Sequence, residues 1–130
     1  MYITGLKLKG KNMFTIYHNP RCSKSRQTLA LLEEQTQKTQ QEITIVEYLK
    51  TPLEQSEITR ILSQLNCSAI EMMRTKEKEF SEQNLKEANE AQLINAMVNT
   101  PKLIERPIVT DGNKAIIGRP PENVLTFFSV

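Results

Sequence analysis

The chain passes from its first predicted strand into its first predicted helix through Met13-Phe14-Thr15-Ile16-Tyr17-His18-Asn19-Pro20-Arg21-Cys22-Ser23-Lys24-Ser25-Arg26. Residues 13–17 form an apolar run rich in β-forming side chains, and Asn19-Pro20 ends it. A helical spacing of apolar residues then begins, so Cys22 lies where a strand gives way to a helix. Unpaired N–H groups and aligned peptide dipoles at a helix N-terminus favour an anion. We therefore expect Cys22 to be a thiolate, the nucleophilic form of cysteine.

The residues around Cys22 strengthen this prediction. The segment from His18 to Gln27 contains no acidic residue, and its basic or proton-donating side chains are His18, Arg21, Lys24 and Arg26. These polar neighbours disfavour the alternative of a buried structural thiol. Ser25 occupies the position of the second cysteine in a C-x-x-C motif, so Cys22 has no local partner for a disulfide. The segment predicts a single reactive thiol in a basic pocket.

Composition and charge exclude several classes of function. The chain has 130 residues, of which 25% are charged and 38% hydrophobic, and these values are typical of a folded soluble domain. We expect one domain over residues 13–130 and a disordered or non-native N-terminal extension over residues 1–12. Three of the 17 basic residues lie in that extension, and the remaining 14 stand against 15 acidic residues. This balance does not predict a nucleic-acid partner, and apolar runs of only a few residues do not predict a membrane partner.

The use of cysteine and histidine predicts the compartment. Cys22 and Cys67 are the two cysteines, and the chain has one histidine. A small secreted domain built on disulfides would carry more cysteines, and we find no secretory signal, so we predict a reducing cytoplasm. The same count argues against a structural zinc site. Cys67 follows the apolar stripe of a predicted helix and is interpreted as packing, with a resolving role as the lesser alternative.

The hydrophobic pattern predicts an α/β fold. We expect strands at 13–17 and 43–46 around a helix at 23–34, and a β-hairpin of strands 108–110 and 115–117 around Asp111-Gly112-Asn113. A last helix should begin at Pro121 and bury Val124, Leu125 and Phe128. A strand, a crossover helix and a second strand require parallel pairing, whereas a hairpin is antiparallel. The prediction is a four-stranded mixed sheet in the order β-α-β, a helical insert, then β-β-α.

The insert is predicted to contain four helical segments. The first should begin at Thr51-Pro52-Leu53-Glu54, with Thr51 as the cap and Glu54 closing a capping box, and should bury an apolar stripe at Ile58, Ile61, Leu62 and Leu65. The second should span 68–76 with Ile70 and Met73 facing inward, and the third should be a short surface helix within 82–90. The last should be capped at Asn89, should bury Leu93, Ile94 and Met97, and should end before Pro101.

Three arginines outside the cysteine segment are candidate anion ligands. Arg106 and Arg119 are single cations at the mouths of apolar strands, and each precedes a proline that restricts its backbone. Guanidinium groups bind tetrahedral oxyanions with fork-shaped hydrogen bonds. The alternative is that these arginines pair with glutamates. For Arg74, which lies close to Glu77 and Glu79, spacing alone favours that alternative.

The motifs together resemble one known family, the glutaredoxin-coupled arsenate reductases, in their small housekeeping subgroup. The resemblance covers residues 13 to about 128. It rests on His18-Asn19-Pro20-x-Cys22, Arg74, Glu105-Arg106-Pro107-Ile108-Val109 and Gly118-Arg119-Pro120. It implies a thioredoxin-like fold and reduction of arsenate to arsenite in arsenic detoxification. Arg21 and Ser23-Lys24 add charge where resistance-associated members tend to carry small residues, so arsenate turnover is expected to be weak or the substrate different.

The resemblance also implies roles for individual residues. Cys22 is the nucleophile; Arg74, Arg106 and Arg119 bind the oxyanion; His18 tunes the thiolate, Ser25 hydrogen-bonds it, and Pro107 is a cis-proline beside it. No cofactor is bound. Glutathione is implied as co-substrate and glutaredoxin as protein partner, because one catalytic cysteine needs external thiols to complete the reduction.

Two alternatives remain open. The same fold family includes regulators that bind RNA polymerase and sense oxidation through a C-x-x-C pair, which is absent here. The second alternative is a glutathione-linked oxidoreductase that acts on mixed disulfides and needs Cys22 but not all three arginines.

Overall fold

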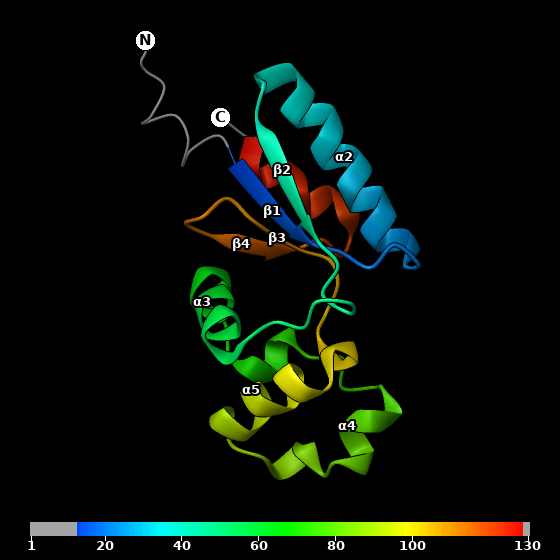
Figure 1. The fold of residues 1–130 in the computed structure, drawn as a ribbon, viewed down its shortest axis with the longest axis vertical. Helices are drawn as coiled ribbons and strands as arrows, with labels where there is room; N and C mark the ends of the chain where they lie inside the picture. Colours follow the sequence, from blue (N-terminus) through cyan, green and yellow to red (C-terminus); the bar gives the residue numbers. More distant parts are fainter. Residues whose placement is uncertain (1–12, 129–130) are drawn as a thin grey trace.

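A mixed four-stranded sheet organises the molecule. The computed structural model describes residues 13–128, and its strands are β1 (Met13–Tyr17), β2 (Glu42–Val46), β3 (Ile108–Thr110) and β4 (Ala115–Ile117). They lie in the order β2-β1-β3-β4, with β1 and β2 parallel and the other pairs antiparallel (Figure 1). The predicted sheet is therefore confirmed. The expectations for residues 1–12 lie outside the described residues.

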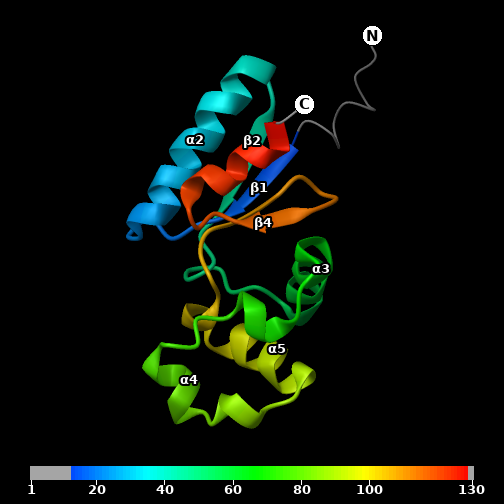
Figure 2. The same ribbon diagram turned by 180° about the vertical axis from the view of Figure 1, so that it is seen from behind.

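Two helical elements cover one face of the sheet. They are the helix α2 (Ser23–Thr39) and the 3₁₀ helix η4 (Pro121–Phe128), which lie side by side in Figure 2. The buried side chains between them and the sheet are Phe14, Ile16, Leu32, Val109 and Val124. Burying these apolar surfaces is the main stabilising term for this layer.

The helical insert packs against the same sheet from its other side and extends from one end of it (Figure 1). Its α-helices are α3 (Gln55–Leu65), α4 (Lys78–Glu82) and α5 (Glu90–Asn99), and its 3₁₀ helices are η1 (Ala69–Met72), η2 (Leu85–Glu87) and η3 (Pro101–Leu103). A second core cluster joins α3 and α5 to the sheet residues Tyr17, Ile108 and Ala115. The insert and the sheet thus share one continuous apolar interface.

Two predicted helix boundaries were wrong. Helix α2 runs five residues past the predicted end at Glu34, because glutamines and Lys38 are good helix formers and no glycine or proline interrupts them. Helix α3 begins at Gln55 rather than near Thr51. Leu53 is buried in an extended segment before the helix, and Glu54 rather than Thr51 is the N-cap residue.

The two middle helices of the insert were also misplaced. The predicted helix over 68–76 is the single 3₁₀ turn η1, closed by a capping box between Ser68 and Glu71, and Ile70 is 39% exposed instead of buried. The predicted helix within 82–90 is replaced by α4, which ends at Glu82, and by η2. In both places a short run packs through isolated side chains such as Phe80, so no long amphipathic period forms.

Other local predictions are confirmed. Asn89 caps α5 and forms a capping box with Gln92, and the hairpin strands have the predicted bounds. Gly112 has a φ of +99°, a backbone conformation that its missing side chain permits. The last helix is a 3₁₀ helix that buries Val124, while Leu125 and Phe128 are half-buried.

The strand register brings one end of each of the four strands to the same end of the sheet. Tyr17 at the end of β1 pairs with Val46 at the end of β2 and with Ile108 at the start of β3. Ile108 in turn pairs with Ile117 at the end of β4, and the Gly118 N–H donates to the Pro107 carbonyl at 2.9 Å. The segments that follow β1, β2 and β4 and the segment that precedes β3 therefore lie close together. They carry every candidate site residue except Arg74.

Gly118 lets this edge pack closely against α2, and its substitution is expected to be costly. A Cβ at this position would lie 2.7 Å from Thr28 Oγ1, 2.8 Å from Thr28 Cγ2 and 3.0 Å from Pro107 Cγ. We expect Gly118→Ala to lower the free energy of unfolding by about 1–3 kcal/mol, as overpacking does elsewhere. Urea denaturation would measure it. In the Gly118→Ala/Thr28→Ala double variant the loss should be smaller than the sum of the single losses, and additivity would refute the steric explanation.

No helix within residues 13–128 is long and apolar enough to cross a membrane.

Candidate active site

Cys22 lies at the N-terminus of α2, as the sequence predicts. It is the N-cap residue with extended backbone angles, its carbonyl accepts the Arg26 N–H at 3.0 Å, and its own N–H donates to the Asn19 carbonyl at 3.0 Å. Burial alone would raise the pKa of the Cys22 thiol. The backbone N–H groups of Ser25 and Lys24 and the guanidinium of Arg106 outweigh burial, and the pKa lies below its ordinary value. The thiolate is thus stabilised by the helix start and by one arginine.

This environment predicts a titration that needs no substrate. The rate of Cys22 alkylation by iodoacetamide should rise with pH with a midpoint below about 8.5, the value of a free cysteine, because only the thiolate reacts. A Cys22→Ser control would identify the reacting thiol, since Cys67 has its pKa raised by burial and by Glu71 and Glu90. A midpoint at or above the free value would contradict an activated thiol.

His18 and Ser25 form a buried pair behind the cysteine. His18 Nδ1 lies 2.7 Å from Ser25 Oγ, and that hydroxyl also accepts the Asn19 N–H at 3.0 Å. Burial lowers the pKa of His18 and the nearby Arg26 lowers it further, while Glu47 and Glu33 oppose the shift, so the imidazole is neutral at neutral pH. The backbone N–H of Ser25 stabilises the thiolate, whereas its side-chain hydroxyl is hydrogen-bonded to His18 and to the Asn19 N–H.

Arg106 is the arginine at the thiol. It is separated from β3 by one residue, and its guanidinium lowers the pKa of the Cys22 thiol. Within residues 13–128 it forms no ion pair, and its Nε is buried without a hydrogen-bond partner. A buried donor without a partner costs free energy, so an oxyanion that accepts this N–H would be favoured here.

Arg74 reaches the site through a short pairing of distant segments. Met73 and Ile104 form an isolated β-bridge, and the Arg74 N–H donates to the Leu103 carbonyl at 2.7 Å. The Arg74 side chain lies 3.0 Å from Glu77 and 3.6 Å from Glu105. The alternative of glutamate pairing therefore describes its contacts correctly, and its charge is partly compensated.

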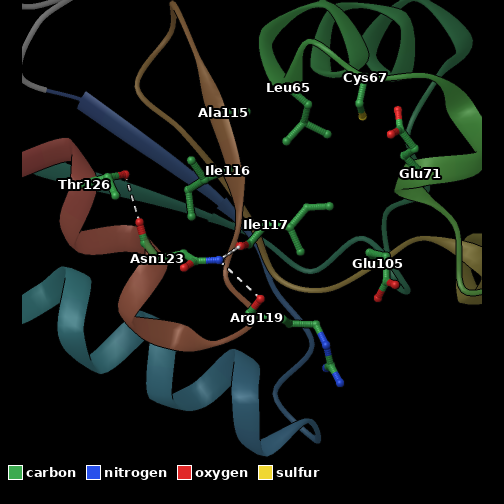
Figure 3. A pocket seen from close by; sticks show the side chains of 10 residues that line it. All are labelled: Leu65, Cys67, Glu71, Glu105, Ala115, Ile116, Ile117, Arg119, Asn123 and Thr126. Atoms are coloured by element: carbon green, nitrogen blue, oxygen red, sulfur yellow. Dashed lines mark hydrogen bonds between the residues drawn. The ribbon is translucent and has the colours of Figure 1, made fainter.

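Arg119 lies opposite this pairing, on the segment that follows β4. Its side chain is exposed, and within the described residues it has no carboxylate partner. Arg74, Glu105 and Arg119 line a shared cavity of about 290 Å³. Glu105 and Arg119 also form one end of a groove of about 510 Å³ between the insert and β4, with Cys67 and Glu71 at the other end (Figure 3). Arg74 and Arg119, two of the predicted anion ligands, thus line one cavity, and Arg119 also lines the larger groove.

Pro107 and Cys67 are the remaining residues for which the sequence analysis made a prediction. The Arg106–Pro107 peptide bond is cis, as the resemblance implies, and Arg119–Pro120 is a second cis bond that was not expected. Cys67 is a free, half-buried thiol packed against the core, in agreement with the packing interpretation.

Tyr48 is a site residue that sequence reasoning missed. It follows β2 by two residues and is 1% exposed. Burial raises its pKa to about 12, while the charges of Arg106 and Arg74 lower it and that of Cys22 raises it further. The signal was present, because the carboxyl ends of adjacent parallel strands meet at one edge of a sheet. A residue just after the second strand therefore lies near the cysteine loop that follows the first.

Known proteins are similar to this chain in sequence and in fold. The ArsC family model matches residues 17–127. The Escherichia coli K12 protein YfgD is 50% identical over 85% of this chain and 92% of its own length, and an arsenate reductase of Haemophilus influenzae is 44% identical over 85% and 94%. A solved structure titled arsenate reductase from Vibrio cholerae superposes with a TM-score of 0.82 at 44% identity, covering 88% of this chain and 97% of that one. The predicted thioredoxin-like α/β fold is confirmed, and the chain belongs to the ArsC family.

Proposed function

We propose that this protein reduces arsenate to arsenite with Cys22 as the nucleophile. The observation that carries the proposal is the pairing of a stabilised thiolate with Arg106, a cation without a carboxylate partner in the described chain and with a buried, unsatisfied N–H. A thiolate repels an anionic substrate, so an enzyme of this kind needs a fixed cation beside the sulfur. The names of its ArsC relatives support arsenate as that anion.

The first step is formation of a bond between Cys22 Sγ and arsenic. The thiolate attacks arsenate, and an arsenic–oxygen bond breaks with release of water after protonation of the leaving oxygen. Arg106 and Arg119, assisted by Arg74, hold the remaining arsenate oxygens and oppose the build-up of negative charge. The arginines bind and orient the substrate and are not consumed.

The reduction requires two external thiols. In our proposal glutathione displaces a second oxygen from arsenic, and glutaredoxin supplies the other thiol, so that arsenic gains two electrons while the thiols leave as a mixed disulfide. Water then hydrolyses the remaining bond between Cys22 Sγ and arsenic(III): its hydroxide goes to arsenic and its proton to the sulfur, which releases arsenite and the free Cys22 thiol. The absence of a cysteine at Ser25 supports external thiols, since no local disulfide can form there, and the groove beside Arg119 has room for a tripeptide.

Arsenate-dependent oxidation of NADPH tests this function. The assay contains the protein, glutathione, glutaredoxin and glutathione reductase, and turnover should require arsenate and rise with protein concentration. Leaving out glutaredoxin alone tests the coupling separately from the reduction.

A different result would identify a competing function. No arsenate turnover in a folded protein whose Cys22 alkylates rapidly would contradict the proposal, and turnover of glutathione mixed disulfides in the same assay would favour the oxidoreductase alternative. Capture of RNA polymerase subunits that persists in Cys22→Ser would favour the regulator.

A further inference from the structure

The smaller cavity beside the proposed anion ligands is lined by carboxylates as well as by cations. Its cations are Arg74, Lys76 and Arg119, and its carboxylates are Glu77 and Glu105. An oxyanion that carries no proton is bound by hydrogen-bond donors, and a carboxylate, which can only accept, repels it. The contacts of the two glutamates show that they have different roles in this cavity.

Glu77 uses both of its oxygens on cations of the protein. Its Oε2 accepts the Nε–H of Arg74 at 3.0 Å, and its Oε1 lies 3.6 Å from Lys102 Nζ. A charge-assisted hydrogen bond of this kind is among the stronger contacts of a side chain. Glu77 therefore anchors the Nε edge of the Arg74 guanidinium in the cavity.

Glu105 has a carboxylate that the described chain leaves unsatisfied. Its Oε1 is buried and has no hydrogen-bond partner within residues 13–128, and Arg74 Nη1, at 3.6 Å, is too far from it for a hydrogen bond. The backbone at this position is fixed, because the Glu105 N–H donates to the Met72 carbonyl at 2.8 Å. A buried acceptor without a donor costs free energy, so a ligand that brings an O–H group into the cavity is favoured.

We propose that Glu105 selects a protonated tetrahedral oxyanion, such as hydrogen arsenate, by accepting a hydrogen bond from its O–H group. Arg74 and Arg119, which line the same cavity, donate to the oxygens that carry no proton. An oxyanion without a proton, such as sulfate, presents only lone pairs to the carboxylate and is repelled. The inference rests on the proposed function for the identity of the substrate, and it adds the protonation state that the site recognises.

The test compares inorganic phosphate and sulfate as ligands of the protein at mildly alkaline pH. Both are then mainly tetrahedral dianions, and hydrogen phosphate has the shape and the O–H group of hydrogen arsenate, whereas sulfate has no O–H group. We expect NMR titrations of the wild type to show tighter binding of phosphate. In Glu105→Gln the preference for phosphate over sulfate should fall about 10- to 100-fold, the value of a hydrogen bond to a charged group, while the affinity for sulfate rises.

Glu77→Gln is the matched control. It removes the same charge from the same cavity and from the same arginine, but the oxygens of Glu77 already face Arg74 and Lys102. Its effect on the affinities for phosphate and sulfate should be the same in direction and size, so that their ratio stays unchanged. An equal fall of the ratio in both variants would show that charge alone sets the preference and would overturn the inference.

The remaining outcomes separate this inference from the proposed function. A wild type that binds sulfate as tightly as phosphate, or that binds neither, would refute the selection by Glu105, and so would a Glu105→Gln variant that keeps the full preference. A wild type that prefers phosphate but does not turn over arsenate would refute only the proposed function, because the titrations contain no arsenate and no thiol.

Discussion

Replacing Cys22 with serine is expected to reduce arsenate turnover by at least about 1000-fold, the scale seen when a catalytic nucleophile is removed. A serine hydroxyl is far less acidic than a thiol and remains protonated, whereas the cysteine is held as a thiolate by the N–H groups of Ser25 and Lys24 and by Arg106. The substitution changes one atom at a half-buried position, so the fold should persist. The coupled NADPH assay measures the loss, and circular dichroism confirms folding.

Cys67→Ser is the matched control for this prediction. Cys67 is the other cysteine of the chain and is also half-buried, but burial and two glutamates raise the pKa of its thiol, and it lies in the groove rather than at the start of α2. Its replacement should leave turnover within about twofold. A Cys67 variant as inactive as the Cys22 variant would instead support the resolving role that the sequence left as the lesser alternative.

The sheet was predictable because each of its strands carries a local signal. The turn at Asp111-Gly112-Asn113 fixes both hairpin strands, and the spacing of one helix between two apolar runs fixes the parallel pair. The helical insert was less predictable, since its segments are short and held by tertiary contacts. Ile70 matches an inward position of a long helix, but a capping box at Ser68 starts a single 3₁₀ turn that turns it outward.

The site also contains residues that the sequence marks and residues that it does not. Cys22 and the two arginines before prolines stand at the ends of predicted strands, where the sequence itself marks them. Tyr48 has no sequence motif that marks it, because a tyrosine after a strand is more often part of the core. The pairing of both β2 and β3 with β1 brings the segment that contains Tyr48 to the same end of the sheet as Arg106. The hydroxyl of Ser25 could not be assigned from spacing either, since His18 and the loop use it.

Arg106→Ala is expected to lower kcat/KM for arsenate by about 100- to 1000-fold, as removal of a fixed oxyanion donor does in other enzymes. The effect should exceed that of Arg119→Ala, because Arg119 is exposed while Arg106 has a buried Nε and lies at the thiol. The alkylation midpoint of Cys22 should also rise in the Arg106 variant. Arg60→Ala is the matched control, since Arg60 is exposed and pairs weakly with Glu57 at 3.9 Å.

A lysine at position 106 separates the charge of Arg106 from its shape. Arg106→Lys keeps a cation that can lower the Cys22 pKa but loses the fork of donors that binds two oxygens of one anion. The alkylation midpoint should therefore stay near that of the wild type while kcat/KM for arsenate remains low. Full turnover in both Arg106 variants would contradict an arginine oxyanion site.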